Sequence, residues 1–427
     1  FRQGNWPLWN PHTLLGVPQF AEPQFSTFYP PLWLAARLPT NVAFGVLYAF
    51  HFGLAAAGGY WLLRRLDSGP AGAFLAALIF GFNNFMTARI YAGHFAPLMT
   101  MAYLPWCLAA VHALAHKKRW LFVPLTAVPL ALALLAGSAS FFPLLLVALT
   151  AVMGWLLWRT YQSDGKTTAA KLTAQFTAVL LFAPLLAAVQ IIPTIQFFQY
   201  SNRTTITYEF ASSFSFPLQN LLALAMPFLL TPDQLSDPAW QGYHGSQFWE
   251  YALYAGVLPL ILFMLSCKSG QRSWRFWHFL AGGGLLVAIG PAGVVHRLLF
   301  QFAPGFDAFR APSRFAFLFT LSAAVLSGLM FDAWLKRPPT ERQAVTRQIR
   351  PYLLATTAVL ITLAIIMLSF AAEPTPDALR ESMANDLLLA ALLLFGSTIL
   401  LFQQGWANRP RLLTAAITLL LLLDLWS

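Results

Sequence analysis

Isolated arginines in the connectors between apolar stretches are the residues best suited to chemistry. Such arginines stand in or beside connectors that hold no lysine: Arg89, Arg203, Arg310 and Arg314. A guanidinium presents a planar fork of N–H donors that matches a phosphate group. We therefore expect these arginines to contact a phosphate. The structural alternative is an ion pair with a nearby acid, which would be Glu209 for Arg203 and Asp307 for Arg310 or Arg314.

A reaction at these connectors also needs a group that accepts a proton. Glu22 is the only acid in the proline-rich opening segment, and it is predicted to act on an acceptor or a metal, with a structural role as the alternative. His94 follows Gly93 at the expected end of a helix and could bind phosphate or exchange a proton. Its alternative is a hydrogen-bonded interface histidine. Gln190 is predicted to contact substrate, and its alternative is a buried hydrogen bond between helices.

A metal or organic cofactor has little support in the sequence. One loop holds four possible ligands whose spacing fits no metal motif: Asp233, Asp237, His244 and Glu250. No cofactor is certain, a divalent metal is left open, and its ligands are unknown. No connector carries a glycine-rich phosphate loop after a strand, which argues against a nucleotide-binding domain.

Apolar stretches must position these residues. The chain is 58% hydrophobic and 10% charged over 427 residues, whereas a soluble domain carries roughly 25% charged residues. A membrane-spanning helix needs about 20 apolar residues. We expect an all-α integral membrane protein with twelve spans, at residues 41–63, 70–84, 96–113, 120–135, 141–158, 172–192, 251–265, 276–289, 315–335, 352–370, 386–402 and 411–427.

Lysine placement predicts the orientation of these helices. All lysines fall in alternate connectors: Lys117, Lys118, Lys166, Lys171, Lys268 and Lys336. Positive charge is retained on the cytoplasmic side of a bilayer, so these connectors are predicted to face inward and the arginine-bearing ones outward. The net charge of +11 is then a topology signal and not a nucleic-acid footprint.

The expected outward loops are residues 1–40, 193–250 and 291–314 of a single transmembrane domain covering residues 1–427. Short amphipathic helices are expected in these loops at the interface. One is predicted at 294–302, with His296 and Arg297 facing away from its apolar surface. Because these distant segments carry nearly all the unusual outward polarity, we expect Glu22, His94, Arg203, Arg310 and Arg314 to line one outward cavity.

Motifs in these loops resemble one protein family. In the opening loop they are Gly4, Pro7, Leu8, Trp9, Asn10, Pro11, Gly16, Pro18, Glu22, Gln24, Tyr29 and Pro30. Further along they are Gly93, His94, Pro105, Trp106, Gln190, Pro193, Thr194, Ser201, Arg203, Tyr243, Gly245, Glu250, Tyr254, Gly256, Phe309, Arg310, Pro312, Arg314 and Phe315. Their order, from about residue 4 to 332, resembles the YfhO-type bacterial membrane proteins of the GT-C group of polytopic glycosyltransferases.

The resemblance implies a helical bundle of GT-C type in the bacterial cytoplasmic membrane, with an active face directed outward. It implies transfer of a sugar from a polyprenyl-phosphate donor to an extracytoplasmic glycan, lipid or polymer. Asn10 would then contribute to substrate binding. The family's characteristic Asp lies upstream of the first loop, so the chain is expected to begin just after a missing first helix.

Two other functions remain open at this stage. A transporter or flippase of lipid-linked saccharides would place polar residues at mid-membrane depth and would break helices in corresponding halves. The sequence has few charges within its apolar stretches and no internal repeat, which disfavours that reading. A non-catalytic assembly factor on the same scaffold is the third hypothesis. The sequence does not specify the sugar, the acceptor or the oligomeric state.

Overall fold

The structure is a computed structural model that describes residues 6–13, 15–200, 207–224, 248–303, 306, 310–369, 377–402 and 409–426. Within these ranges nearly all regular structure is helical. The exception is an isolated β-bridge between Asn10 and Val17, and no β-strand occurs in the described chain. The predicted all-α class is therefore confirmed for the described residues.

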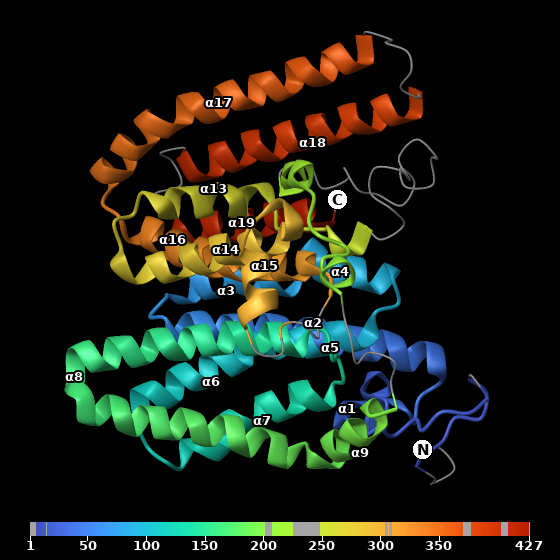
Figure 1. The fold of residues 1–427 in the computed structure, drawn as a ribbon. Helices are drawn as coiled ribbons and strands as arrows, with labels where there is room; N and C mark the ends of the chain where they lie inside the picture. Colours follow the sequence, from blue (N-terminus) through green and yellow to red (C-terminus); the bar gives the residue numbers. More distant parts are fainter. Residues whose placement is uncertain are drawn as a thin grey trace.

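The first half of the chain forms one group of helices (Figure 1). They are α1 (Pro30–Ala35), α2 (Thr40–Arg65), α3 (Pro70–Gly81), α4 (Asn84–Tyr91), α5 (Phe95–Ala102), α6 (Leu104–Lys117), α7 (Phe122–Leu135), α8 (Phe142–Leu186) and α9 (Ala188–Phe198). Proline occupies the first turn of α1, α3, α6 and α8, where its fixed φ favours the helix and its missing N–H costs no bond.

Helix α8 is two helical arms joined at Gly165, which has φ +81° and ψ 176°. A side chain would be strained at that φ, so glycine permits the chain to reverse there. The two arms correspond to the spans predicted at 141–158 and 172–192, although the second arm ends at Leu186. The connector between them is the one predicted to face inward.

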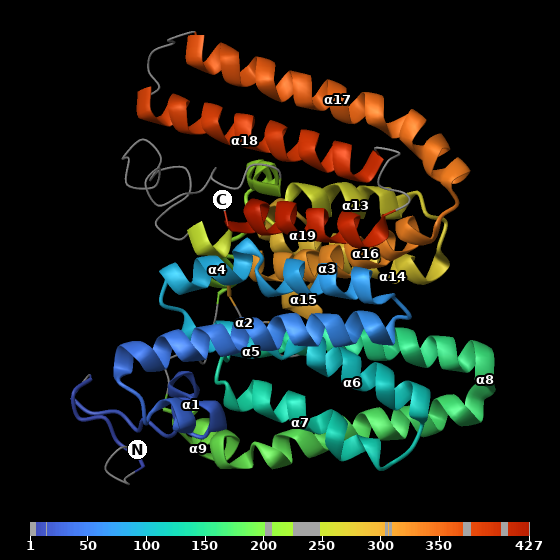
Figure 2. The same ribbon diagram turned by 180° about the vertical axis from the view of Figure 1, so that it is seen from behind.

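The second half forms a further group. It contains α10 (Tyr208–Ala211), α13 (Val257–Cys267), α14 (Arg275–Ala288), α15 (Val295–Phe302), α16 (Phe317–Lys336), α17 (Pro339–Ser369), α18 (Asp377–Phe402) and α19 (Pro410–Trp426). Two short 3₁₀ turns, η3 (Phe248–Glu250) and η7 (Pro312–Ala316), precede α13 and α16. Helix α16 is buried along most of its length, and α17 packs beside α18 at the edge of the bundle (Figures 1 and 2).

Helix α3 joins the two groups because it packs against α2 and also against α16. These contacts depend on small residues. A methyl group added at Gly72 would lie 2.2 Å from the carbonyl oxygen of Gly328, and one added at Gly328 would lie 2.5 Å from that of Gly72. Small residues at helix interfaces let backbones approach closely in membranes.

Seven helical segments in the described chain are long and apolar enough to cross a membrane: Thr40–Arg65, Pro70–Tyr91, Phe95–Lys117, Phe142–Leu186, Pro312–Lys336, Thr340–Ile366 and Met383–Phe402. The chain is thus a membrane protein by the length and composition of its helices. Helices α7, α13, α14 and α19 have 11 to 17 residues, fewer than the ~20 of a full span. The number of twelve spans stays a prediction.

The lysine-bearing connectors gather at one end of the bundle. The bend of α8, the α13–α14 connection and the α16–α17 connection all lie at the left of Figure 1. An ion pair between Lys118 and Asp164 joins two of these connectors directly. We call this the lysine end and the opposite one the lysine-free end; that the lysine end faces the cytoplasm stays a prediction.

The predicted helix at 294–302 is present as α15, but one part of that prediction was wrong. His296 is 2% exposed, with its ring 5.6 Å from those of Tyr208 and Phe306. Arg297, the next residue, is exposed and lies over the Tyr208 ring. The helix therefore packs against α10 with His296 inward, which local amphipathicity did not indicate.

Candidate functional site

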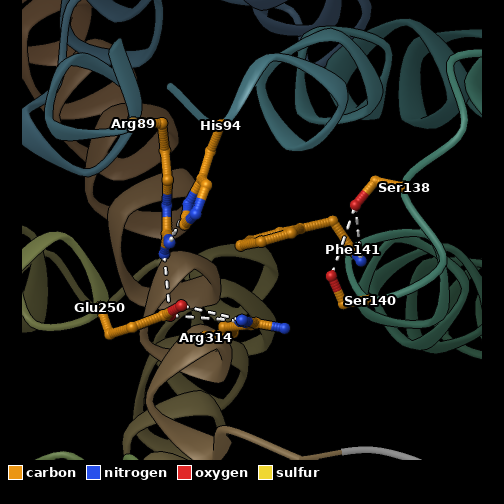
Figure 3. A network of polar contacts seen from close by, with 7 residues as sticks. All are labelled: Arg89, His94, Ser138, Ser140, Phe141, Glu250 and Arg314. Carbon is orange, nitrogen blue, oxygen red and sulfur yellow. Dashed lines mark hydrogen bonds and ion pairs between the residues drawn. The ribbon is translucent and has the colours of Figure 1, made fainter. Parts of the chain in front are cut away.

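Four charged or titratable side chains from separate elements meet at the lysine-free end (Figure 3). Arg89 comes from α4, His94 from the turn before α5, Glu250 from η3, and Arg314 from η7. We call this group the arginine–glutamate cluster. It lies where the first and second helix groups meet, since α4 contacts η3 across that boundary.

Glu250 uses both carboxylate oxygens to bind the two arginines. Arg89 Nη2 donates to Oε2 at 3.0 Å. Arg314 Nη2 donates to Oε1 at 2.8 Å and Arg314 Nε to Oε2 at 3.1 Å, which is the bidentate fork expected of arginine and carboxylate. The Arg89 side chain is 0% exposed, that of Glu250 1% and that of Arg314 16%. Arg314 is therefore the cation of the cluster that a ligand can reach.

Aromatic rings complete the surroundings of both guanidiniums. The Phe141 ring lies beside both, with its centroid 5.1 Å from the Arg89 guanidinium carbon and 5.3 Å from that of Arg314. The Phe85 ring lies 4.7 Å from the same carbon of Arg89. A cation over a ring face is attracted by the ring quadrupole, more strongly when water is excluded. Phe141 thus stabilises both guanidiniums from one side of the cluster, while Glu250 bridges them.

The cluster carries a net positive charge in a desolvated place. Burial alone would raise the pKa of the Glu250 carboxyl, but the charges and hydrogen bonds of Arg89 and Arg314 reverse this effect and lower that pKa to about 2. Glu250 is therefore ionised at neutral pH, and two guanidiniums facing one carboxylate leave one positive charge. Arg89 Nε is also buried with no hydrogen-bond partner among the described residues. This arrangement suits the binding of an anion.

His94 lies beside Arg89 and its role depends on its tautomer. Arg89 Nη1 is 3.5 Å from His94 Nδ1, and because the guanidinium only donates, Nδ1 is the acceptor and Nε2 carries the proton. Burial, followed by the charge of Arg89, lowers the pKa of the His94 imidazole. The ring stands edge-on to Trp249 at 5.5 Å. A neutral His94 with an Nε2–H group is suited to donate to an anion.

The turn from Ala136 to Phe141 connects this cluster to the opening loop. Gly137 has φ +87°, and a methyl group there would lie 1.9 Å from the carbonyl oxygen of Pro23. Ser26 Oγ donates to the Ala136 carbonyl at 2.9 Å, and Ser138 Oγ accepts from the Phe141 amide at 3.3 Å. The segment that positions Phe141 beside the arginines therefore also packs on Pro23, the residue next to Glu22. Sequence analysis missed this turn, although its Gly-Ser-Ala-Ser run is a turn signal.

Glu22 in the opening loop and Gln190 on α9 both make hydrogen bonds that shape this loop. Glu22 caps a 3₁₀ turn by accepting from the Gln24 amide at 3.4 Å. Gln190 donates to the Phe20 carbonyl at 3.0 Å, and Thr194 donates to that of Ala21 at 2.8 Å. Helix α9 thus fixes the loop that carries Glu22. Gln190 bonds a loop carbonyl and not another helix, and its predicted contact with substrate stays a prediction.

Asn10 also makes local bonds. Its Oδ1 accepts from the His12 amide at 3.0 Å, and its Nδ2 donates to Thr13 Oγ1 at 3.0 Å. An asparagine that bonds two residues along is typical of a tight turn. Its predicted role in substrate binding stays a prediction.

The structure brings together His94 and Arg314 of the predicted cavity, and adds Arg89 and Glu250. Arg310 is exposed, with its guanidinium carbon 5.1 Å from the Phe210 centroid and 5.6 Å from that of Phe214. Residues of the predicted cavity and its alternatives that lie outside the described chain are Arg203 and Asp307. The partner of Arg314 is Glu250, 64 positions away in sequence, which a search for nearby acids could not find.

No group of three or more His, Cys, Asp or Glu side chains that could hold a metal ion occurs among the described residues. Three of the four acids and histidines considered as ligands lie outside that part of the chain: Asp233, Asp237 and His244. The fourth, Glu250, has both oxygens bonded to arginine. Cys107 and Cys267 are free thiols.

Comparison of the chain with protein-family models, with curated proteins and with solved structures gave no match. The functional argument therefore depends on the geometry of the cluster itself.

Proposed function

We propose that this chain is a polytopic membrane glycosyltransferase. It would move a sugar from a polyprenyl-phosphate donor to an acceptor glycan, lipid or polymer at the lysine-free face. The observation that supports this most directly is the buried arginine–glutamate cluster, whose net positive charge has one partly exposed cation, Arg314. A lipid-linked phosphate is an anion that a membrane protein can bind at such a cation.

In the proposed reaction the acceptor hydroxyl oxygen forms a bond to the anomeric carbon as the bond from that carbon to the carrier phosphate breaks. The leaving phosphate gains negative charge, which Arg314 and the Nε2–H of His94 stabilise more in the transition state than in the ground state. The hydroxyl proton passes to a carboxylate. Glu250 is an unsuitable acceptor because two arginines hold it ionised with a pKa of about 2. Glu22 is the proposed base, because its neighbour Pro23 packs on the turn that leads to Phe141.

The test is transfer of labelled sugar from a synthetic polyprenyl-phosphate donor in proteoliposomes. Arg314→Ala should lower the transfer rate by ~10²–10³, as does removal of one donor from an oxyanion hole. Arg314→Lys should restore only part of the rate, because lysine keeps the charge and loses the planar fork. Arg297→Ala is the matched control, since Arg297 is an exposed arginine on α15 outside the cluster.

Two results would replace the proposal. If the wild-type protein moves the lipid-linked sugar across the bilayer and forms no new glycoside, the protein is a flippase. If it binds the donor with neither transfer nor translocation, it is a non-catalytic factor. Glu22→Gln tests whether Glu22 acts as the base or has only a structural role. If it is the base, the variant should abolish transfer while donor binding and the amount of protein in the membrane stay unchanged.

A further inference from the structure

A second site lies among α1, α2, α6 and α7, away from the arginine–glutamate cluster. It is a cavity of about 500 Å³ lined by Pro30 and Pro31, by one face of α2, by α6 and by α7. That volume lies within the range of small-molecule sites, ~300–1,000 Å³. None of its lining residues is charged.

The cavity is a groove that runs along the helix axes. Its α2 residues are Phe50, Leu54 and Trp61, and at ~1.5 Å rise per residue the first and last are about 16 Å apart. This is close to half of the ~30 Å hydrocarbon thickness of a bilayer. Pro30 and Pro31 begin α1, which lies toward the lysine-free end of the bundle (Figure 2). The groove extends from there along the half of α2 that ends at Arg65, so it has the length and direction of one lipid chain.

Three lining residues carry a polar group: Trp61, Tyr103 and Trp106. The Trp106 indole N–H donates to the Leu54 carbonyl at 2.7 Å. The Tyr103 hydroxyl, at the start of α6, belongs to a chain of hydrogen bonds. His51 Nδ1 lies 2.6 Å from the Leu47 carbonyl, so Nδ1 must carry a proton. His51 Nε2 lies 2.7 Å from the Tyr29 hydroxyl, which lies 2.7 Å from that of Tyr103. His51 is 0% exposed and its hydrogen-bond and ring contacts in the described chain include no acid. A charged imidazole would be costly there, so it is neutral and Nε2 accepts.

This tautomer fixes the direction of every hydrogen in the chain. Tyr29 donates to His51 and Tyr103 donates to Tyr29. The Tyr103 oxygen then has no proton left to offer the groove and has lone pairs that accept. Tyr103 is a lining residue of the groove. A ligand matched to it is apolar along its length and carries a hydrogen-bond donor, without charge, at the level of Tyr103.

We propose that this groove binds an uncharged long-chain lipid alcohol, with its hydroxyl donating to the Tyr103 oxygen and its hydrocarbon chain lying along α2. A phosphate ester is a poor match because no cation lines the groove. The site is independent of the proposed glycosyl transfer, and binding there needs no chemistry.

The test uses the full chain in phosphatidylcholine nanodiscs with three photoreactive probes of equal chain length: a 16-carbon alcohol, its methyl ether and its phosphate monoester. Mass spectrometry locates the cross-links. The alcohol should label α2, α6 and α7 about 5-fold more than the ether, the preference that one neutral hydrogen bond supplies. Tyr103→Phe should remove this preference, and Tyr60→Phe, on an exposed part of α2, should keep it.

Ala110→Phe provides a second test because it fills the groove from α6. It should reduce labelling by alcohol and ether alike. Equal labelling by alcohol and ether in the wild-type protein would overturn the proposal, as would stronger labelling by the phosphate ester. Cross-links spread evenly over lipid-facing helices such as α17 would also overturn it, since they would show bulk lipid only.

Discussion

Two buried polar clusters in this bundle satisfy their buried groups in opposite ways, one with charged and one with neutral side chains. The arginine–glutamate cluster keeps three formal charges out of water, with Glu250 bridging Arg89 and Arg314. The chain of Tyr103, Tyr29 and His51 keeps none and ends on the backbone carbonyl of Leu47. Hydrogen bonds hold both clusters together, yet the first keeps a net charge and the second does not.

The difference shows what each cluster can bind. Desolvating charges is expensive, and a buried ion pair is weak evidence for stability. A cluster that keeps an excess cation is better explained by an anionic ligand than by folding. The neutral chain carries no such excess, and its single acceptor at Tyr103 selects for an uncharged donor. The two regions thus predict ligands of opposite character, and the following changes test that contrast in order of expected effect.

Glu250→Ala should have the largest effect. It leaves the guanidiniums of Arg89 and Arg314 facing each other without a counter-ion, and breaking a buried pair in this way costs about 3–5 kcal/mol of stability. Unfolding of the detergent-solubilised protein, followed by heat or denaturant, measures the loss. Glu209→Ala is the control because Glu209 is an exposed acid on α10. Similar losses of unfolding free energy for both variants would contradict the role of Glu250 as the buried counter-ion of two arginines.

Gly137→Ala should come next, because it strains the turn that carries Phe141. Its φ of +87° disfavours any side chain, and the added methyl would meet the Pro23 carbonyl. Strain of this kind costs about 1–3 kcal/mol, and it should be accompanied by weaker donor binding. Gly154→Ala in α8 is the control, since a methyl there meets nothing within 4 Å and alanine favours the helix. If Gly137→Ala leaves donor binding unchanged, the contact between the opening loop and this turn does not affect the arginine–glutamate cluster.

Tyr29→Phe should destabilise the neutral chain by less than Glu250→Ala destabilises the charged cluster. It leaves the Tyr103 donor and the His51 acceptor buried without partners, which costs about 1–3 kcal/mol. Tyr60→Phe on the exposed part of α2 is the reference in the same unfolding assay. A loss larger than that of Glu250→Ala would reverse the comparison between the two clusters.

Lowering the pH should destabilise the protein through the charged cluster, and this effect is the smallest of the four near neutral pH. The pKa of Glu250 is lowered to about 2 from an ordinary 4.5, so its stabilising contribution is complete above pH 4.5 and is lost as the pH falls from there through about 2. The unfolding free energy of the wild-type protein should fall across that range more steeply than that of Glu250→Gln. Parallel profiles would show that Glu250 does not titrate as its two arginine partners require.

Particular elements show how far local sequence reached. Proline in the first turn of α1, α3, α6 and α8 and glycine at the bend of α8 are local features that favour a helix start or a chain reversal where the structure has one. The lysine-bearing connectors gather at one end, as their alternation predicted. The inward burial of His296 was missed because the neighbouring elements that cover it, α10 and the ring of Phe306, are not encoded within α15.

The sequence by itself determined that the chain is helical, that it is apolar enough for a membrane, and that its isolated arginines cluster in the lysine-free connectors. These properties depend on composition and on neighbours a few residues apart. Only the tertiary structure decided that Glu250 lies between Arg89 and Arg314, because those partners are 161 and 64 positions away. The net positive charge of the cluster and the exposure of Arg314 depend on the packing of α4, η3 and η7 near Phe141. No local sequence pattern carries that information.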